Sequence, residues 1–532
     1  MSRFVRASKY RHVFGQPAKK EHNIENVKVT NSAWDTNVVS ASGKYLSINW
    51  NASGGGAFAI IPLPSPFAPI PNFPHKLPDT LALARSHTAP VLDTDWSPHN
   101  DSIVASAGED GKVMIWNIDA SAFDEWGADD WEPRDFDPVW RIDASPRKVG
   151  QVLFHPTAQN VLASAGGDLS VKLWDLAQTE TPKSVLTGHG DAIQSLAYNP
   201  TGTLLATTCR DRKLRLFDPR AGGEAVRITD GHGGIKASRL AWMGELDKIA
   251  TTGFSKMSDR QVSIWEVGSL KNEKTIAVDQ SAGVVMPFWT DNNILFLAGK
   301  GDGNIRYYEY ESDNLYALAE YKSSDPQRGM CFLPRRALNV SECEIARAYK
   351  VSGSTVEPIA FIVPRKADGF QSDIFPPASS IEPSMNAAEF FSGKTAPRKL
   401  VDLASGTTFS GAASTTSSAP APVPAAAPAP TVTTTLPAPT GAAAVPAPSP
   451  IAKSFSSPQP SSTITSAPPP SSAPVHTSNG SSEEVETLRT ENASLKSQLR
   501  EAREMIRNLE LQVEAQRVNA RKAAQALIDA AS

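Results

Sequence analysis

The chain has 532 residues, of which 52 are lysine or arginine and 56 are aspartate or glutamate, so its formal net charge is −4 at pH 7. This balance produces no overall field that favours nucleic acid, and no apolar run approaches the ~20 residues that span a bilayer. The N-terminus lacks the apolar core of a secretory signal. The three cysteines, Cys209, Cys331 and Cys343, contain no C-x-x-C pair, which argues against structural zinc and for a reducing compartment.

The chain begins with a basic segment, because residues 1–28 include seven lysines or arginines and two acidic residues. Within it, Arg11–Pro17 predicts a short strand and a turn. Further on, apolar and aromatic residues indicate three more strands, at Trp34–Val39, Tyr45–Ile48 and Phe58–Ile61. These strands form a first, degenerate unit of the repeat that follows.

From Ser86 the chain repeats a pattern of about 40 residues, whose clearest copy is Gly188–Asp218. In five copies an aspartate stands six residues before a closing aromatic residue: Asp110 and Trp116, Asp168 and Trp174, Asp211 and Phe217, Asp259 and Trp265, and Asp302 and Tyr308. This period, with Gly-His openings such as that at His189 and Trp-Asp endings, is typical of WD40 β-propellers, one blade per repeat. We expect the aspartate to accept backbone N–H bonds in the turn before the third strand, and the aromatic ring to pack between blades.

The sequence predicts seven blades. Met330–Leu333, Glu344–Val351 and Ile359–Val363 predict the strands of a last unit after the five clear ones and the degenerate first one. An open propeller would leave sheet edges unpaired. We therefore predict that an N-terminal strand around Val13 completes the last blade.

One link between blades is longer than the others. Asp119–Asp143 is acidic and contains Trp126, Trp131 and Trp140. It is interpreted as a surface loop, and the alternative is a docking peptide for a basic, grooved partner.

Composition then divides the chain into four parts. Residues 1–363 are the propeller, and residues 364–402 are an extension whose apolar residues are expected to pack on a propeller face. Residues 403–482 are rich in proline, alanine, serine and threonine, which predicts a disordered linker. Residues 483–532 carry heptads that predict an α-helical coiled coil.

The heptad positions are expected to make the chain a homo-oligomer. The residues that carry the pattern are Val485, Leu488, Asn492, Leu495, Leu499, Ile506, Leu509 and Val513. A single amphipathic helix that folds back on the propeller is the alternative. Asparagine at an a position tends to favour two parallel strands, and both dimer and trimer stay open.

Catalytic motifs are not found in this sequence. His189, Thr207 or Thr208, and Asp211 resemble a hydrolase triad but recur at equivalent positions of the repeats, which indicates a structural hydrogen-bond set. The glycine run at Ser53–Phe58 is not followed by Gly-Lys-Ser/Thr, so it is not a P-loop. The histidines show no metal-ligand spacing. The sequence therefore predicts neither an enzyme nor a cofactor or metal site.

Several stretches resemble the coronins, especially the short fungal type. They are KYRHVFGQP at Lys9–Pro17, ASGGGAF at Ala52–Phe58, HTAPVLDTDWSPHND at His87–Asp101, CEIARAYK at Cys343–Lys350 and VPRK at Val363–Lys366. The resemblance covers residues 1–402 closely and 483–532 in pattern only. The order of propeller, extension, linker and coiled coil also agrees with that family.

The resemblance implies an all-β, seven-bladed WD40 propeller that binds filamentous actin and oligomerises through its coiled coil. It also implies contact with the actin-related protein 2/3 complex, cooperation with cofilin, and a place in the cytoplasm at cortical actin patches. The actin-contacting basic residue of the family falls on Lys28, and Lys19 and Lys20 extend the basic segment. A lysine there keeps the charge of the more usual arginine but loses its bidentate geometry.

Two departures from the family bear on partners. Met505 stands in place of the arginine of a trimer-associated motif that Ile506, Leu509 and Glu510 otherwise match. The linker has no acidic residue, so contact with the nucleator is expected from the coiled coil or from the acidic tryptophan insertion. The rival function is a general WD40 adaptor that grips peptides in membrane traffic or ubiquitin ligation.

Overall fold

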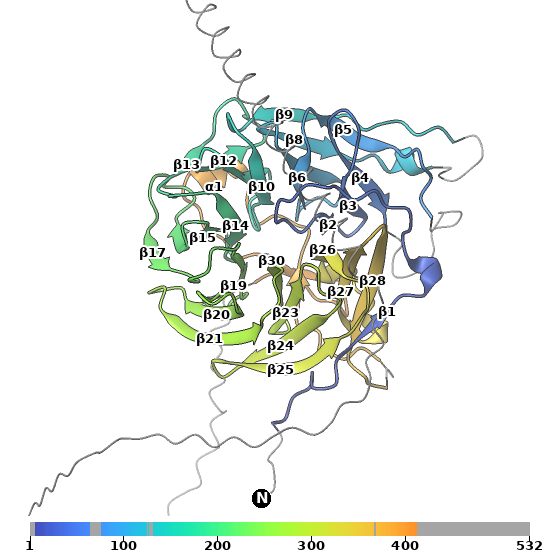
Figure 1. The fold of residues 1–532 in the computed structure, drawn as a ribbon, viewed down its shortest axis with the longest axis vertical. Helices are drawn as coiled ribbons and strands as arrows, with labels where there is room; N and C mark the ends of the chain where they lie inside the picture. Colours follow the sequence, from blue (N-terminus) through green and yellow to red (C-terminus); the bar gives the residue numbers. More distant parts are fainter. Residues whose placement is uncertain (1–5, 64–75, 125, 127–130, 367–368, 412–532) are drawn as a thin grey trace, which may run out of the picture. The chain divides into compact units, whose positions relative to one another are not determined.

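The computed structural model describes residues 6–63, 76–124, 126, 131–366 and 369–411. The chain divides into two compact units, Met1–Pro422 and Val423–Ser532, and all described residues belong to the first. They form seven four-stranded antiparallel sheets arranged around a centre (Figure 1). The WD40 β-propeller predicted from the repeats is confirmed, with seven blades in the described part of the chain.

The blades follow the chain in order, and the first strand of each blade is the innermost. Blade 1 consists of β2 (Val39–Ala41), β3 (Tyr45–Trp50), β4 (Gly56–Pro62) and β5 (Leu83–His87). Blade 2 consists of β6 (Val91–Trp96), β7 (Ile103–Gly108), β8 (Lys112–Asn117) and β9 (Trp140–Asp143). Blade 3 consists of β10 (Val149–Phe154), β11 (Val161–Gly166), β12 (Val171–Asp175) and β13 (Ser184–Leu186).

The remaining blades repeat this order. Blade 4 consists of β14 (Ile193–Tyr198), β15 (Leu205–Cys209), β16 (Lys213–Phe217) and β17 (Arg227–Asp230). Blade 5 consists of β18 (Arg239–Trp242), β19 (Lys248–Phe254), β20 (Arg260–Glu266) and β21 (Asn272–Asp279). Blade 6 consists of β22 (Val285–Thr290), β23 (Ile294–Gly299), β24 (Ile305–Glu311) and β25 (Asn314–Tyr321). Blade 7 consists of β26 (Gln327–Phe332), β27 (Glu344–Ser352), β28 (Thr355–Ile362) and the N-terminal β1 (Phe14–Pro17).

Burial explains why these sequences form strands. Middle strands such as β8 and β27 are buried on both faces, because each blade is covered by a neighbour on either side. Outermost strands such as β21 alternate between exposed and half-buried residues. The hydrophobic core is therefore divided into clusters that lie between successive blades.

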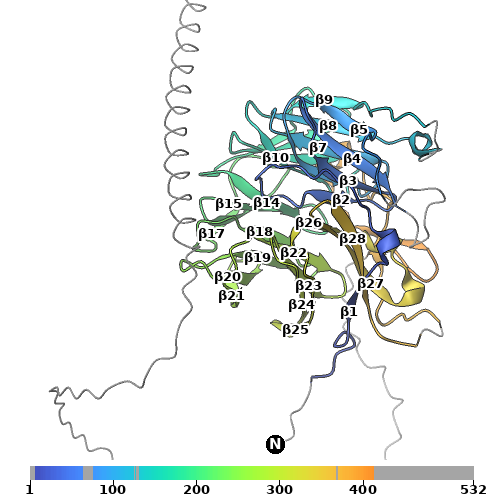
Figure 2. The same ribbon diagram turned by 45° about the vertical axis from the view of Figure 1, so that its right-hand side comes forward.

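The ring is closed by the N-terminus. Strand β1 pairs antiparallel with β28, from Phe14 opposite Ile362 to Pro17 opposite Ile359, and Figure 2 shows it beside β27 and β28. Val13, just before the strand, is buried. Its carbonyl accepts the Tyr307 hydroxyl at 2.9 Å. The predicted closure is confirmed, and the turn precedes the strand rather than following it.

A strand at Trp34 is a wrong prediction. Strand β2 begins only at Val39, and residues 30–38 are irregular. Trp34 donates its indole N–H to the Gly150 carbonyl in blade 3 at 2.9 Å. Trp34 is therefore held in place by a hydrogen bond to blade 3 and does not take part in a strand.

The acidic insertion is not a free loop in its described part. A 3₁₀ helix, η2 (Ala120–Phe123), begins it, and Trp140–Asp143 forms β9, the outer strand of blade 2. Trp126 is buried, with ring centroids 5.2 Å from Phe123 and 5.5 Å from Trp131. Trp126 and Trp131 therefore pack against each other within the insertion. This argues against the docking-peptide interpretation, in which all three tryptophans would contact a partner.

Residues 369–411 cross one face of the ring. They form α1 (Ala387–Phe391) and a small sheet of β29 (Ala378–Ser379), β30 (Lys399–Val401) and β31 (Thr408–Ser410). Asn386 and Glu389 form a reciprocal cap at the start of α1. Phe390 is buried against His155 of blade 3, with ring centroids 4.2 Å apart. Figure 1 shows α1 beside β12 and β13, and β30 at the centre.

Three further 3₁₀ helices complete the described elements: η1 (Lys20–His22), η3 (Arg335–Ala337) and η4 (Val340–Glu342). Within the described residues, no helix has the length and apolar character needed to cross a membrane.

Candidate functional site

The basic N-terminal segment runs along the outer edge of blade 7. After β1, the Ala18 N–H donates to the Pro358 carbonyl at 2.8 Å, and the Val27 N–H to the Ser354 carbonyl at 2.8 Å. This backbone pairing holds Lys19 and Lys20 on the outside of the ring, where both are exposed. The Lys19 ammonium is 3.8 Å from a Glu21 carboxylate oxygen, and both side chains are mostly in water, so this ion pair contributes little.

Lys28 lies where the chain passes from blade 7 to blade 1. Val27 and Val29 on either side are buried, whereas Lys28 is exposed. Its carbonyl accepts the Asn51 N–H at 2.7 Å, which fixes its backbone to blade 1. Its ammonium donates to the Asp79 carbonyl at 3.0 Å, and its side chain is 44% exposed. The result is a positive charge with a defined position at the seam between the first and last blades.

Directly after Lys28, the chain crosses the mouth of the central channel. The Thr36 hydroxyl donates to the Leu92 carbonyl of blade 2 at 2.6 Å, and Arg328 of blade 7 donates to the Thr30 carbonyl at 2.6 Å. Arg239 of blade 5 donates to the Asn37 side-chain oxygen at 2.9 Å. Residues 30–38 thus form hydrogen bonds with blades 2, 5 and 7. These bonds hold the segment that directly follows Lys28.

Two carboxyl groups line the channel below this segment. Asp93 and Asp95 share one face of β6, because residues two apart in a strand point the same way. Asp93 accepts the Val152 N–H at 3.1 Å, and Asp95 accepts the Phe154 N–H at 2.7 Å. Burial raises the pKa of each to about 7, and these hydrogen bonds oppose the rise only in part. Both groups therefore change charge near neutral pH.

Asp93 and Asp95 were missed in the sequence. A signal was present, since the two acidic residues stand two apart, between Leu92 and Trp96, in the first clear copy of the repeat. Their neighbour Arg239 comes from blade 5 and lines the same hollow, which has a volume of about 170 Å³. The spacing of residues in the sequence could not predict that Arg239 lies beside these two carboxyl groups.

Four residues of one repeat form a continuous hydrogen-bond chain that joins His87, at the end of β5 in blade 1, to blade 2. The Trp116 indole N–H donates to the Ser106 hydroxyl at 2.9 Å, and Ser106 lies 2.7 Å from His87 Nε2. His87 Nδ1 lies 3.0 Å from a carboxylate oxygen of Asp110. Because the carboxylate accepts, Nδ1 carries the proton and Ser106 donates to Nε2. Burial raises the pKa of Asp110, but the bond with His87 and backbone N–H bonds outweigh it and lower that pKa.

The other blades keep parts of this arrangement. Asp168 and Asp211 accept the backbone N–H two residues ahead, from Ser170 at 3.3 Å and Lys213 at 3.0 Å. Asp259 accepts instead from the Ser255 hydroxyl. Asp302 pairs with the Arg260 guanidinium at 2.6 Å. The predicted backbone N–H bonds are therefore confirmed for Asp110, Asp168 and Asp211. The prediction is wrong for Asp259 and Asp302, whose carboxylates are bound by side chains instead.

The aromatic residues that close the repeats pack between blades. Trp116 meets Phe58 of blade 1 edge-on, with ring centroids 5.4 Å apart. The clusters between the later blades contain Trp174, Phe217 and Trp265, and Tyr308 packs at the edge of another. These residues hold blades together; Trp116, Trp174, Phe217 and Trp265 are buried, and Tyr308 is half-buried.

The triad-like residues of blade 4 do not form a catalytic set. His189 Nε2 lies 3.0 Å from the Thr207 hydroxyl, but its Nδ1 faces the Leu169 carbonyl, and Asp211 pairs with Arg215. Burial, and then Arg215, lower the pKa of His189 to about 4. In the described residues, no group of three or more histidine, cysteine, aspartate or glutamate side chains is placed to hold a metal ion.

The predicted oligomerisation residues, from Val485 to Val513, lie outside the described residues. The predicted coiled coil stays a prediction, and so does the linker beyond residue 411. The predicted start of the linker at residue 403 is wrong, because β31 (Thr408–Ser410) still pairs with β30 of the extension.

Known families and proteins match most of the described part of the chain. A family model described as a domain of unknown function matches residues 3–67, models of the WD domain, G-beta repeat, match residues 79–117, 136–175 and 180–218, and a type of WD40 repeat matches 356–398. The chain is 49% identical over 411 residues to a coronin-like protein of Schizosaccharomyces pombe, covering 75% of this chain and 65% of that one. It is 44% identical over 410 residues to Coronin-A of Dictyostelium discoideum, covering 76% of this chain and 87% of that one.

A solved structure agrees with these matches. It is the WD40 domain of a Toxoplasma gondii coronin, with a TM-score of 0.66 and 28% identity, covering 74% of this chain and 97% of that one. The chain spans less than two thirds of the length of the coronin-like protein of Schizosaccharomyces pombe.

Proposed function

Because this chain belongs to the coronin family, we propose that it is an actin-filament-binding scaffold that acts without catalysis. In this proposal it works in the cytoplasm, on the cytoskeleton at cortical actin patches. It takes part in filament turnover and branched nucleation together with the actin-related protein 2/3 complex and cofilin. The propeller supplies the filament contact, and residues 483–532 join two or three propellers.

The observation that carries the filament contact is the position of Lys28. Its backbone is bound by Asn51, and its ammonium reaches the surface at the seam between blades. The nearby carboxylate of Asp79 is 4.0 Å away and 89% exposed, so it neutralises the lysine only weakly. A fixed, largely uncompensated positive charge suits an acidic filament surface, and Lys19 and Lys20 add to it.

The coiled coil converts a weak contact into crosslinking. A micromolar contact corresponds to about −8 kcal/mol, and a flexible tether raises avidity by about 10²–10⁴-fold when both heads reach sites. We expect removal of residues 483–532 to weaken filament bundling more than single-site binding. Equal bundling by the truncated chain would contradict this.

The test is co-sedimentation of the full-length chain with actin filaments across a salt series. Lys28→Glu reverses the charge and should abolish pelleting at low salt, whereas Lys28→Arg should retain it. Lys271→Glu is the matched control, since Lys271 is exposed next to the outer strand of blade 5. Circular dichroism verifies that each variant is folded. If Lys28→Glu and Lys271→Glu pellet equally well, Lys28 is not the filament site. If the unaltered chain stays in the supernatant even at low salt, the peptide-binding adaptor becomes the better function.

A further inference from the structure

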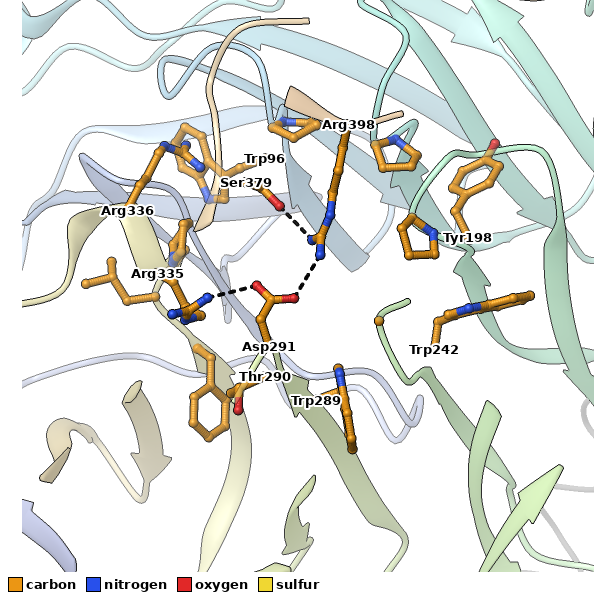
Figure 3. A pocket seen from close by; sticks show the side chains of 18 of the residues that line it. Trp96, Tyr198, Trp242, Trp289, Thr290, Asp291, Arg335, Arg336, Ser379 and Arg398 are labelled. Atoms are coloured by element: carbon orange, nitrogen blue, oxygen red, sulfur yellow. Dashed lines mark hydrogen bonds and ion pairs between the residues drawn. The ribbon is translucent and has the colours of Figure 1, made fainter. Parts of the chain in front are cut away.

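The two faces of the propeller differ in how their charges are compensated. On the face that the extension crosses, a cavity of about 420 Å³ is lined by Trp242, Trp289 and Arg398. Its arginines are paired within the protein, since Arg335 and Arg398 both bind Asp291 at 3.0 Å, as Figure 3 shows. On the opposite face the innermost strands begin, and the loops that lead into them from the preceding blades lie there together.

Two apolar side chains stand almost fully in water on that opposite face. Ile235 is 85% exposed and lies in the loop between β17 of blade 4 and β18 of blade 5. Met257 is 86% exposed and lies in the turn between β19 and β20 of blade 5. The next most exposed large hydrophobic residue of the described chain, Val226, is only 53% exposed. Figure 1 shows β17 across the ring from β1, so this pair is separate from Lys28.

The two loops lie against each other and are held in shape by their backbones. The N–H of Gly234, just before the exposed isoleucine, donates to the Phe254 carbonyl at 2.8 Å. In the turn, the Ser255 N–H donates to the Asp259 carbonyl at 2.8 Å. The exposed methionine therefore stands at the tip of a closed turn, where the backbone keeps it in water.

A surplus of positive charge surrounds the two apolar side chains. The loops at this face next to blades 3, 4 and 5 are residues 144–148, 167–170, 187–192, 210–212, 231–238 and 255–259. They contain four aspartates and six cations, which are Arg147, Lys148, Arg210, Arg212, Lys236 and Lys256.

Two of the four aspartates are neutralised by cations of the strands. Asp168 pairs with Lys172 at 2.7 Å. Asp211 pairs with Arg215 at 2.6 Å. The six loop cations therefore face only the two remaining aspartates, Asp191 and Asp259.

The loop cations keep most of their charge. Lys236 donates to a backbone carbonyl at 2.9 Å, and Arg212 to another at 3.4 Å, and a carbonyl carries no net charge. Arg210 is 3.9 Å from Asp191, with side chains 66% and 48% exposed, so this pair contributes little. The hollow beneath these loops has a volume of only about 10 Å³, roughly the space of one water molecule. The surface thus has apolar tips and a basic border, and no groove.

We propose that this surface docks on an anionic lipid bilayer. Ile235 and Met257 enter the boundary between headgroups and acyl chains, and the surrounding cations contact the lipid phosphates and carboxylates. A bilayer deforms around protruding side chains, whereas a folded protein partner would need a hollow for each of them. The docking is independent of the filament contact at Lys28.

The test is sedimentation of the full-length chain with phosphatidylcholine vesicles, with and without phosphatidylserine, at physiological ionic strength. We expect the chain to pellet with the anionic vesicles and to stay in the supernatant with the neutral ones. The reason is that each lysine or arginine near an anionic surface strengthens binding about fivefold.

Single substitutions separate the apolar tips from the charges. Ile235→Ser and Met257→Ser should each weaken vesicle binding about tenfold, because each removes apolar surface that leaves water. Lys256→Glu should weaken it about 25-fold, because it changes the charge by two. Ile381→Ser and Lys271→Glu are the matched controls, since both residues are exposed on the face that the extension crosses, and both should bind as the unaltered chain does.

The proposal is overturned if the chain does not pellet with anionic vesicles, pellets equally with neutral ones, or binds equally in the loop variants and the controls. Pelleting with actin filaments should be unchanged in Ile235→Ser and Met257→Ser. Its loss in both folded variants would assign the surface to the filament and would also overturn the proposal. If a serine variant does not fold, Met257→Trp decides the question, because a tryptophan at the interface should strengthen vesicle binding.

Discussion

Ser106 carries two buried hydrogen bonds, and its replacement by alanine should destabilise the propeller strongly. The Ser106 hydroxyl accepts from the Trp116 indole and donates to His87 Nε2, at 2.9 and 2.7 Å. All three side chains are buried. Ser106→Ala leaves one donor and one acceptor without partners in a place that water does not reach.

Ser164 provides an internal reference. It occupies the equivalent position in β11 and accepts from Trp174 at 2.9 Å. An unsatisfied buried group costs about 1–3 kcal/mol. Ser106→Ala should therefore lower the free energy of unfolding by about 2–6 kcal/mol, because two groups lose their partner, and Ser164→Ala by about 1–3 kcal/mol, because one does.

Urea denaturation of the full-length chain, followed by tryptophan fluorescence, measures both shifts in midpoint. Ser106→Thr is the rescue variant, since Thr251 in blade 5 joins Trp265 and His232 in the same way, at 2.7 and 2.9 Å. Equal midpoints for Ser106→Ala and Ser164→Ala would refute the reasoning. So would a larger loss in the Ser164 variant.

Two further predictions concern the channel and a turn. Burial raises the pKa of Asp93 and Asp95 from 3.8 to about 7, so their contribution to stability is complete at low pH and is lost as pH rises through 7. Asp93→Asn should therefore flatten the fall in melting temperature between about pH 4 and about pH 7, and an unchanged slope would argue against the raised pKa. Gly111 has φ of 78°, and an added Cβ would lie 2.2 Å from the Ser145 carbonyl oxygen, whereas Gly54 has φ of 80° and nothing within 4 Å. Gly54→Ala should cost about 1–2 kcal/mol from the backbone alone, and Gly111→Ala clearly more; similar denaturation midpoints would show that the close contact is unimportant.

The repeat pattern predicted the propeller because it is a local code. An aspartate in a turn and an aromatic residue six positions later recur in each blade, and neighbouring residues alone determine both the turn and the strand that follows. The closing strand near Val13 was predicted for a different reason, since a ring with an open edge leaves backbone groups unpaired. The interpretation of Trp34 as part of a strand was wrong because its partner, Gly150, belongs to another blade.

The candidate site was predictable only in part. The basic segment and Lys28 stand out in the sequence and through its resemblance to a family. That Lys28 is outward, bound to Asn51 and weakly paired with Asp79 depends on segments distant in the chain.

The sequence by itself determined the class of fold, the number of blades and the basic N-terminal segment. Periodicity, turn residues and composition are properties of neighbouring residues, and they act before the chain is compact. Only the tertiary structure decided the environment of Asp93 and Asp95, the path of residues 30–38 across the channel, and the cavity where Trp242, Trp289 and Arg398 meet. Burial and electrostatic fields come from groups far apart in sequence, so they exist only once the ring has closed.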